Sequence, residues 1–509
     1  MKRNTFILLL LAIVKLLMPL LLHHHEFELH RDEYLYYQQG QHWDLGFLEN
    51  PPMIGILGSL SYMLGGSFFW IRLWPALFGA LTLVVTTGIV KELGGKFFAQ
   101  VIAALGILFS AYMRIHFLFQ PNFLDIFFWT LSAYYLLRYI NSNERSYLFL
   151  LATSTALGWW SKYSILFFVS ALIISIFLTY HRKIMKKKDF WFAVLCGFLM
   201  VIPNIYWQWQ HKWPLLHHMH ELKETQLKYL NKTDFLKEQI LMLLPVFFVW
   251  IGGLIWLLMQ KKFRIIGYMF LLVIIFVMLG SGKGYYTLGA YPMVIAAGGV
   301  WIELNTRYNK GIRIAIVIFI LTLSIPLIPL LLPLSSPTQM ADLNKKWHLD
   351  KAGLLMWEDR KSHPLQQDFA DMLGWKEMTY KAERLFELLP DSTKANTVIY
   401  CRNYGEAGAL KYYGTDDYFR LKVICDNGTF LLWIPDRMWF SNLIFIGSDI
   451  PGTDDEVFQH FSKVTVIDSV SNTFAREHGT KIIFFQNGSD SALKRASQGI
   501  RDMKREFGE

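Results

Sequence analysis

Long apolar runs alternate with short polar connections as far as residue 334, where the pattern changes. A helix needs about 20 mostly apolar residues to cross the hydrocarbon core of a bilayer. The chain offers eleven candidate spans, at 6–22, 71–90, 97–113, 121–137, 147–161, 163–180, 190–208, 239–259, 265–280, 285–304 and 313–333. The fifth and sixth are short and nearly fused. The pattern predicts a polytopic α-helical membrane domain over 1–334, with about eleven transmembrane helices.

Basic residues gather in every second connection between these runs. With the N-terminus in the cytoplasm, the cytoplasmic connections hold Lys91, Lys96, Arg138, Arg145, Arg182, Lys183, Lys186, Lys187, Lys188, Lys261, Lys262, Arg264, Arg307, Lys310 and Arg313. This asymmetry is the one that the positive-inside rule describes. The first run resembles a signal peptide but lacks a clear cleavage site, so we expect a retained anchor. Eleven spans then place the C-terminus outside, together with long loops at 23–70 and 209–238.

The last part of the chain, 335–509, reads as a water-exposed α/β domain. Residues 365–389 have apolar positions at helical spacing before Pro390. Short β-rich runs lie at 397–401, 443–447, 464–467 and 482–485, which predicts a sheet of three or four strands. Cys401 and Cys425 also lie in this part, and the sequence leaves open whether they form a disulfide or stay free.

Composition agrees with a membrane protein. Of the 509 residues, 53% are hydrophobic and 18% charged, whereas soluble domains carry about 25% charge. Three cysteines are too few for a disulfide scaffold. The net charge of +10 would suggest nucleic acid in a soluble protein, but here it follows from the basic cytoplasmic loops. A single large soluble enzyme and a disordered chain are excluded, and no nucleic-acid partner is expected.

An acidic pair follows the first apolar run. Asp32 and Glu33 are succeeded by Tyr34, Tyr36 and Tyr37. Neighbouring residues of a helix point about 100° apart, so one acid is expected to face a ligand and the other to support it. A carboxylate base beside an aromatic surface suits sugar chemistry. An ordinary solvated acidic turn is the plainer interpretation of such a pair taken alone.

Further polar residues fall on the same outer face. Asn122 and Asp125 share one face at the start of a span, where an acid is a functional candidate. Lys162 interrupts two apolar runs, and snorkelling is its plainer explanation. The glycine-rich turn 280–286 carries Lys283 and Tyr285 but lacks the spacing of a phosphate-binding nucleotide loop. We therefore expect contact with a lipid phosphate there and no nucleotide cofactor.

The loop 209–238 is rich in histidine. It carries His211, His217, His218 and His220 among aromatic residues. Histidine with a carboxylate can bind Zn²⁺ or another divalent ion. The alternative for so many histidines is that they lie at the membrane–water interface without binding a metal.

The order of these motifs resembles the polyprenyl-phosphate-sugar-dependent glycosyltransferases of the GT-C fold. That group includes the protein O-mannosyltransferases and the lipid A aminoarabinose transferases. The resemblance runs from residue 1 to about 305, and the tail segment 403–409 is similar to bacterial family 39-type members. It rests on the segments 32–37, 46–52, 71–73, 120–129, 161–163, 207–213 and 283–292.

The resemblance implies roles for individual residues. Asp32 matches the catalytic base, with Glu33 beside it. Relatives usually have Asp where this chain has Asn122, so either Asp125 takes over the second carboxylate role or that role is absent. Donor-phosphate contacts are implied for Arg72, Lys162, Lys283 and Tyr285. A divalent metal (Zn²⁺, Mg²⁺ or Mn²⁺) is implied at Glu49 with His218 or His220, although many relatives carry a different motif at the position of Glu49.

The implied activity is sugar transfer from an undecaprenyl-phosphate-type carrier to an extracytoplasmic glycan, lipid or protein, with inversion, in a bacterial inner membrane. A transporter or flippase of lipid-linked saccharides is the main alternative, and it predicts internal repeats and charges at the bilayer midplane. A scaffold with a decayed membrane site is the third, and Asn122 is its main support.

Overall fold

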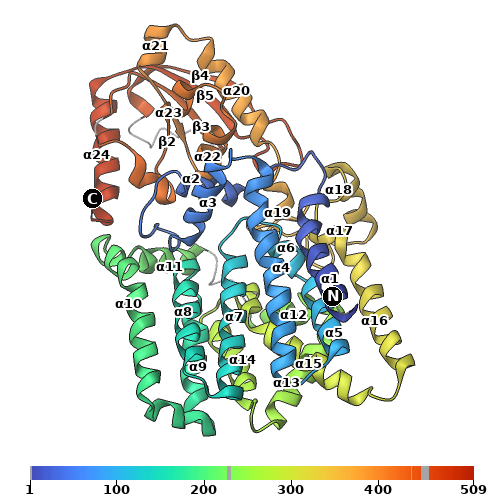
Figure 1. The fold of residues 1–509 in the computed structure, drawn as a ribbon. Coiled ribbons are helices and arrows are strands. Elements are labelled where there is room, and N and C mark those ends of the chain that lie inside the picture. Colours follow the sequence, from blue (N-terminus) through green and yellow to red (C-terminus); the bar gives the residue numbers. More distant parts are fainter. Residues whose placement is uncertain (1–2, 226–230, 437, 449–457, 509) are drawn as a thin grey trace.

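The computed structural model describes residues 3–225, 231–436, 438–448 and 458–508. A bundle of long helices makes up one half of the molecule, and a sheet flanked by helices covers one end of that bundle (Figure 1). Residues 22–67, between the first two long helices, lie at the junction of the two halves, and we call them the outer segment.

The bundle is built from helices that follow the apolar runs. They are α1 (Arg3–Leu21), α4 (Phe68–Glu92), α5 (Phe97–Leu108), α6 (Tyr112–Ile115), α7 (Asn122–Ser142), α8 (Ser146–Ser161), α9 (Ile165–Leu178), α10 (Lys188–Gln210), α12 (Lys232–Leu241), α13 (Phe247–Met259), α14 (Arg264–Leu279), α15 (Tyr291–Asn305), α16 (Lys310–Ser324) and α17 (Ile328–Leu331). The short 3-10 helices η1 (Tyr180–Lys186), η3 (Leu244–Val246), η4 (Gly284–Ala290) and η5 (Ile325–Leu327) connect some of them.

Five helical segments of the described chain are long and apolar enough to cross a membrane, and the number rises to seven if each of two bent pairs is one span. The five are Arg3–Leu21, Phe68–Glu92, Lys188–Gln210, Gly284–Asn305 and Lys310–Leu331. The bent pairs turn by 106° after α9 and by 70° between α12 and α13. The helices α5 and α14 are apolar but shorter. The chain is therefore a helical membrane protein, while the count of eleven spans stays a prediction.

Glycine allows two central helices to approach closely. A Cβ on Gly298 of α15 would overlap the Val249 carbonyl, and a Cβ on Gly253 of α13 would overlap the Val294 carbonyl. Small residues let helix backbones pack tightly in a bilayer, where van der Waals contact drives association. This packing explains why α15 is buried along almost its whole length.

The outer segment contains two short helices, α2 (Arg31–Gln39) and α3 (Met53–Met63). His30 begins α2 through a capping box: its ring accepts from the Asp32 amide, and the Glu33 carboxylate accepts from the His30 amide. A capping box satisfies the free amides at a helix start. It also fixes the direction of Asp32 relative to Glu33. The other long connection contains α11 (Pro214–Thr225).

The tail domain contains a five-stranded mixed sheet of order β2-β1-β3-β5-β4. Its strands are β1 (Thr397–Cys401), β2 (Val423–Cys425), β3 (Asn442–Gly447), β4 (Phe461–Ser469) and β5 (Lys481–Gly488). Strand β1 pairs in parallel with β2 and with β3, whereas β5 pairs antiparallel with β3 and with β4. The helices of the tail are α18 (Pro337–Lys346), α19 (Gln367–Ala370), α20 (Trp375–Glu387), α21 (Asp391–Ala395), α22 (Tyr404–Tyr413), α23 (Asp417–Lys422) and α24 (Asp490–Glu506), with 3-10 turns η6 (Gly428–Trp433) and η7 (Phe458–His460).

Two details of the tail differ from the prediction. The expected helix at 365–389 is split into α19 and α20, because Gly374 takes a left-handed conformation with φ +88° that ends the first turn and starts the next helix. The sheet has a fifth strand, β2, of three residues, too short to give an alternating pattern. Cys401 and Cys425 are neighbours in the parallel register of β1 and β2, and both thiols are free.

The tail and the outer segment share one hydrophobic core. Helix α22 packs on α2, where Gly408 lies against Tyr34: a Cβ on this glycine would come within 2.6 Å of the Tyr34 Cβ. Buried residues of both parts, among them Phe27, Tyr34, Trp375 and Ala407, belong to one continuous cluster. The tail is therefore fixed on the segment that carries the acidic pair.

Candidate active site

Asp32 lies at the start of α2 and faces the tail domain. The Tyr404 hydroxyl donates to one carboxylate oxygen of Asp32 at 2.8 Å, and the Gln120 side-chain amide donates to the other at 3.1 Å. Burial by itself would raise the pKa of Asp32, but His30, Arg31 and the Tyr404 hydrogen bond outweigh it and hold this pKa below its usual value. Asp32 is thus kept as a carboxylate that can accept a proton.

Glu33 has a different environment. It is fully buried and accepts from the Phe119 amide at 2.6 Å and from the His30 amide. Its third partner is Arg72 of α4, which donates at 2.6 Å, is equally buried and also donates to the Phe117 carbonyl at 2.7 Å. The structure therefore brings Arg72 to Glu33, as an ion pair that fixes α2 to the bundle. The described acceptors of Arg72 are Glu33 and Phe117, and its expected contact with the donor phosphate stays a prediction.

A chain of side-chain hydrogen bonds runs from Asp32 to Lys162. The Gln120 carbonyl oxygen accepts from Asn122 at 3.1 Å, and the Asn122 carbonyl oxygen accepts from the Lys162 ammonium at 2.6 Å. Lys162 donates at one end and Asp32 accepts at the other, so every amide in the chain has one consistent orientation. Asn122 is thus a neutral link between a cation and the carboxylate.

Asp125 lies one turn into α7, next to the Lys162 end of this chain. It is buried and accepts from the Ser164 hydroxyl at 2.8 Å, and the charge of Lys162 acts on it. Its described partners do not include Asp32. The arrangement places Asp125 beside Lys162 at the break between α8 and α9.

The glycine-rich turn also contacts Lys162. The Lys162 ammonium lies 4.5 Å from the ring centre of Tyr286 and 5.5 Å from that of Tyr285, within the range of cation–π contacts. Lys283, at the start of the same turn, lies 4.0 Å from Glu358 of the tail. Its charge also acts on Lys162. Both lysines therefore lie at the ends of bundle helices, on the side that the tail covers.

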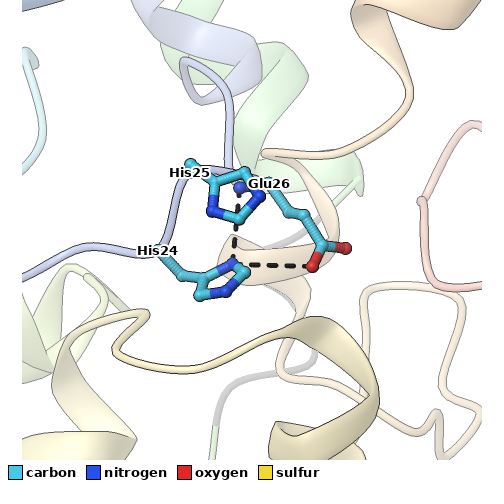
Figure 2. Close-up of side chains that lie close together, drawn as sticks. All are labelled: His24, His25 and Glu26. Carbon is cyan, nitrogen blue, oxygen red and sulfur yellow. Dashed lines mark hydrogen bonds and ion pairs between the residues drawn. The ribbon is translucent and has the colours of Figure 1, made fainter.

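The expected metal ligands lie on two different segments. Glu49 accepts from the Thr429 amide at 2.7 Å and from the Thr429 hydroxyl and Gln39. His218 and His220 lie on α11, with His220 exposed. Among the described residues, the one group of three whose ligand atoms lie within 4.8 Å of one another is His24, His25 and Glu26, on the turn after α1 (Figure 2). The metal site that the resemblance implies, at Glu49 with His218 or His220, stays a prediction.

Tyr404 and Gln120 are not among the site residues that the sequence predicts. Tyr404 begins α22, where the Asn403 side chain accepts from the amides of Gly405 and Glu406, and Glu406 accepts from the Asn403 amide. The glycines after this cap were the available signal, because a Cβ on Gly405 would overlap Arg31. A capped helix start with small residues is built for close packing against another segment.

Comparison with known proteins identifies the fold. Residues 49–207, less than half of the chain, match the family model described as Dolichyl-phosphate-mannose-protein mannosyltransferase. The lipid A galacturonosyltransferase RgtD of Rhizobium johnstonii is 26% identical over 201 residues, which cover 38% of this chain and 41% of that protein. The chain thus matches less than half of the length of this curated relative.

Two solved structures share the architecture over most of the chain. ArnT from Cupriavidus metallidurans bound to undecaprenyl phosphate superimposes with a TM-score of 0.64, 13% identity and coverage of 96% of this chain and 98% of that one. The oligosaccharyltransferase of Archaeoglobus fulgidus in complex with Zn and sulfate gives a TM-score of 0.50 at 11% identity, with coverage of 86% and 68%. The chain therefore has the GT-C glycosyltransferase fold, and the family match supports a glycosyltransferase.

Proposed function

We propose that this protein transfers a sugar from an undecaprenyl-phosphate-type carrier to an acceptor outside the bacterial cytoplasmic membrane. In this proposal residues 1–334 form the membrane domain, with a cytoplasmic N-terminus. Residues 335–509 lie on the periplasmic side. The observation that carries the proposal is the hydrogen-bonded chain from Lys162 to Asp32, since it puts a cation and a base at one end of the membrane helices.

The proposed reaction is a single displacement. Asp32 takes the proton from an acceptor hydroxyl, and the hydroxyl oxygen attacks the anomeric carbon of the donor sugar. The bond from that carbon to the phosphate oxygen breaks, and the bonding electrons leave with the polyprenyl phosphate. One displacement inverts the configuration at the anomeric carbon. Tyr404 and Gln120 hold Asp32 in place for this step.

The leaving phosphate gains negative charge as the bond breaks, and a preorganised cation stabilises it most at that moment. Lys162 and Lys283, with Tyr285 beside them, are the proposed phosphate contacts. Asp125 is proposed to hold Lys162 in place rather than to act as a second base. It accepts from the Ser164 hydroxyl and lies near the Lys162 ammonium, both at the α8–α9 break. The undecaprenyl phosphate in the ArnT structure supports a polyprenyl-phosphate donor.

A transporter of lipid-linked saccharides would need its charged groups where they face both sides in turn. The polar side chains from Asp32 to Lys162 lie instead at helix ends that the tail covers, which supports sugar transfer. The proposal contains no step through a metal, since Glu49 is engaged by Thr429 and Gln39.

Mass spectrometry of envelope glycans from a deletion strain tests the proposal. We expect one sugar to be lost from an extracytoplasmic glycan or lipid, and the matching lipid-linked sugar to accumulate. A deletion strain with an unchanged glycan profile and no accumulated lipid-linked sugar would contradict it.

A further inference from the structure

A pocket of about 230 Å³ lies between the outer segment and the tail domain. Its walls include His42, Trp43, Asp44 and Phe47 from the outer segment and Thr429 and Trp433 from η6. We call it the outer pocket. Drug-sized sites occupy about 300–1,000 Å³, so the outer pocket suits one small ring.

Two contacts fix the walls of the outer pocket to each other. The Leu48 amide donates to the Thr429 hydroxyl at 3.0 Å, while Glu49 accepts from the Thr429 amide. Behind the loop, Asn204 of α10 donates to the Leu45 carbonyl at 2.7 Å, and Gly46 packs against the Trp207 ring. The bundle, the outer segment and the tail therefore all hold the pocket in shape.

Its lining combines flat rings with polar groups. The His42 ring stacks on Trp433 with 4.0 Å between ring centres and 13° between planes, and Trp43 is 66% exposed. Because His42 Nδ1 faces the Gln38 carbonyl at 3.1 Å, it must be the donor there, which leaves Nε2 as an acceptor. Rings with adjacent hydroxyl-binding groups are the surface that a pyranose needs: its C–H face packs on an aromatic ring while its hydroxyls form hydrogen bonds.

The outer pocket is linked to Asp32 through Tyr404. One Asp32 oxygen faces Gln120, from which the hydrogen-bonded chain leads to Lys162; the other faces Tyr404. The Tyr404 amide donates to the Asn427 side chain at 3.4 Å, and Gly428 lies between Tyr404 and Glu49. The segment 427–429 therefore joins the pocket to Tyr404, whose hydroxyl contacts a different Asp32 oxygen from the one that Gln120 contacts.

We infer that the outer pocket binds a sugar ring of the acceptor, held on Trp433 and Trp43 next to the hydroxyl that Asp32 deprotonates. The inference rests on the proposed function, because the assignment to the acceptor uses the positions of Asp32 and Lys162. It restricts the acceptor to a saccharide or glycolipid and excludes a bare protein hydroxyl.

Saturation-transfer difference NMR on the full chain in nanodiscs tests this with methyl hexopyranosides as probes, in neutral, amino and uronic forms. At least one is expected to give a signal that Trp433→Ala and Trp43→Ala weaken about three- to tenfold, the loss expected for one aromatic packing contact. Trp43 is largely exposed, so its replacement keeps the fold even if Trp433→Ala does not. Trp439→Ala is the matched control, because Trp439 is 72% exposed in the same domain but outside the pocket.

Saturating undecaprenyl phosphate should leave the sugar signal unchanged. Loss of the signal on its addition would instead indicate the donor sugar and overturn the acceptor assignment. A wild-type protein without any signal, or an equal loss in Trp439→Ala, would overturn the inference itself. The glycan profile of the deletion strain reports on the proposed function independently, since it does not depend on which pocket holds the acceptor.

Discussion

The hydroxyl of Tyr404 donates to the carboxylate of Asp32 across 372 residues of sequence. Through this bond the tail domain contributes directly to the candidate active site. Burial and the charge of Asp32 raise the pKa of the Tyr404 phenol, so Tyr404 stays protonated and remains a donor. The tail is thus part of the proposed enzyme and not an appendage to it.

Tyr404→Phe should change the pH dependence of transfer. The Tyr404 hydrogen bond helps to keep the pKa of Asp32 low, so its loss raises that pKa. A base works as the carboxylate, and the acidic limb of the rate profile should therefore move to higher pH, with the neutral rate less affected. Initial rates across the pH range measure this. An equal loss of rate at every pH would indicate only a disturbed fold.

Lys162→Met and Lys283→Met should each lower kcat more than they raise KM, because a phosphate contact strengthens as the leaving group forms. If both lysines act on one phosphate, the loss of transition-state stabilisation in the double variant should be smaller than the sum of the losses in the two single variants. Lys237→Met is the control, since that side chain is 71% exposed on α12. Two small, additive effects on protein yield, with kcat preserved, would mean that the lysines only snorkel to the interface.

Glu33→Gln should destabilise the fold. It leaves the Arg72 charge buried without a counter-charge, and breaking a buried pair costs about 3–5 kcal/mol. The double variant Glu33→Gln/Arg72→Met should recover part of this loss. Thermal unfolding in detergent measures both, with Glu92→Gln as the control because the Glu92–Arg138 pair is partly exposed at 3.4 Å. Equal melting temperatures for Glu33→Gln and Glu92→Gln would disprove the assigned role.

The tail should lie on the periplasmic side. The basic residues of alternate connections favour this orientation, and the Tyr404–Asp32 contact requires the tail and the acidic pair to share one side. Alkaline phosphatase fused to the C-terminus should be active, and a cytoplasmic reporter fused there inactive. The reverse pattern would place both the tail and the proposed site in the cytoplasm.

The sequence predicts the features that depend on nearby residues. The apolar runs gave α1, α4 and α10, because hydropathy alone defines such helices. The acidic pair beside the aromatics points to Asp32, whose catalytic role stays a prediction. Contacts between distant segments could not be predicted in this way. No local pattern joins Tyr404 to α2, and nothing in the chain near Arg72 indicates that Arg72 forms an ion pair with Glu33. The break at Gly374 was missed because the helical spacing of apolar residues continues across it.

Complementation of the deletion strain with the Asp32→Asn allele tests the central claim most directly. This substitution keeps the size of the side chain and removes its basicity, and loss of a general base lowers rates by about 10²–10⁴. The account predicts that the Asn variant inserts at the wild-type level, but that mass spectrometry finds the sugar missing from the envelope and retained on its lipid carrier. A wild-type glycan profile from the Asn variant, present at the same protein level as the wild type, would contradict it.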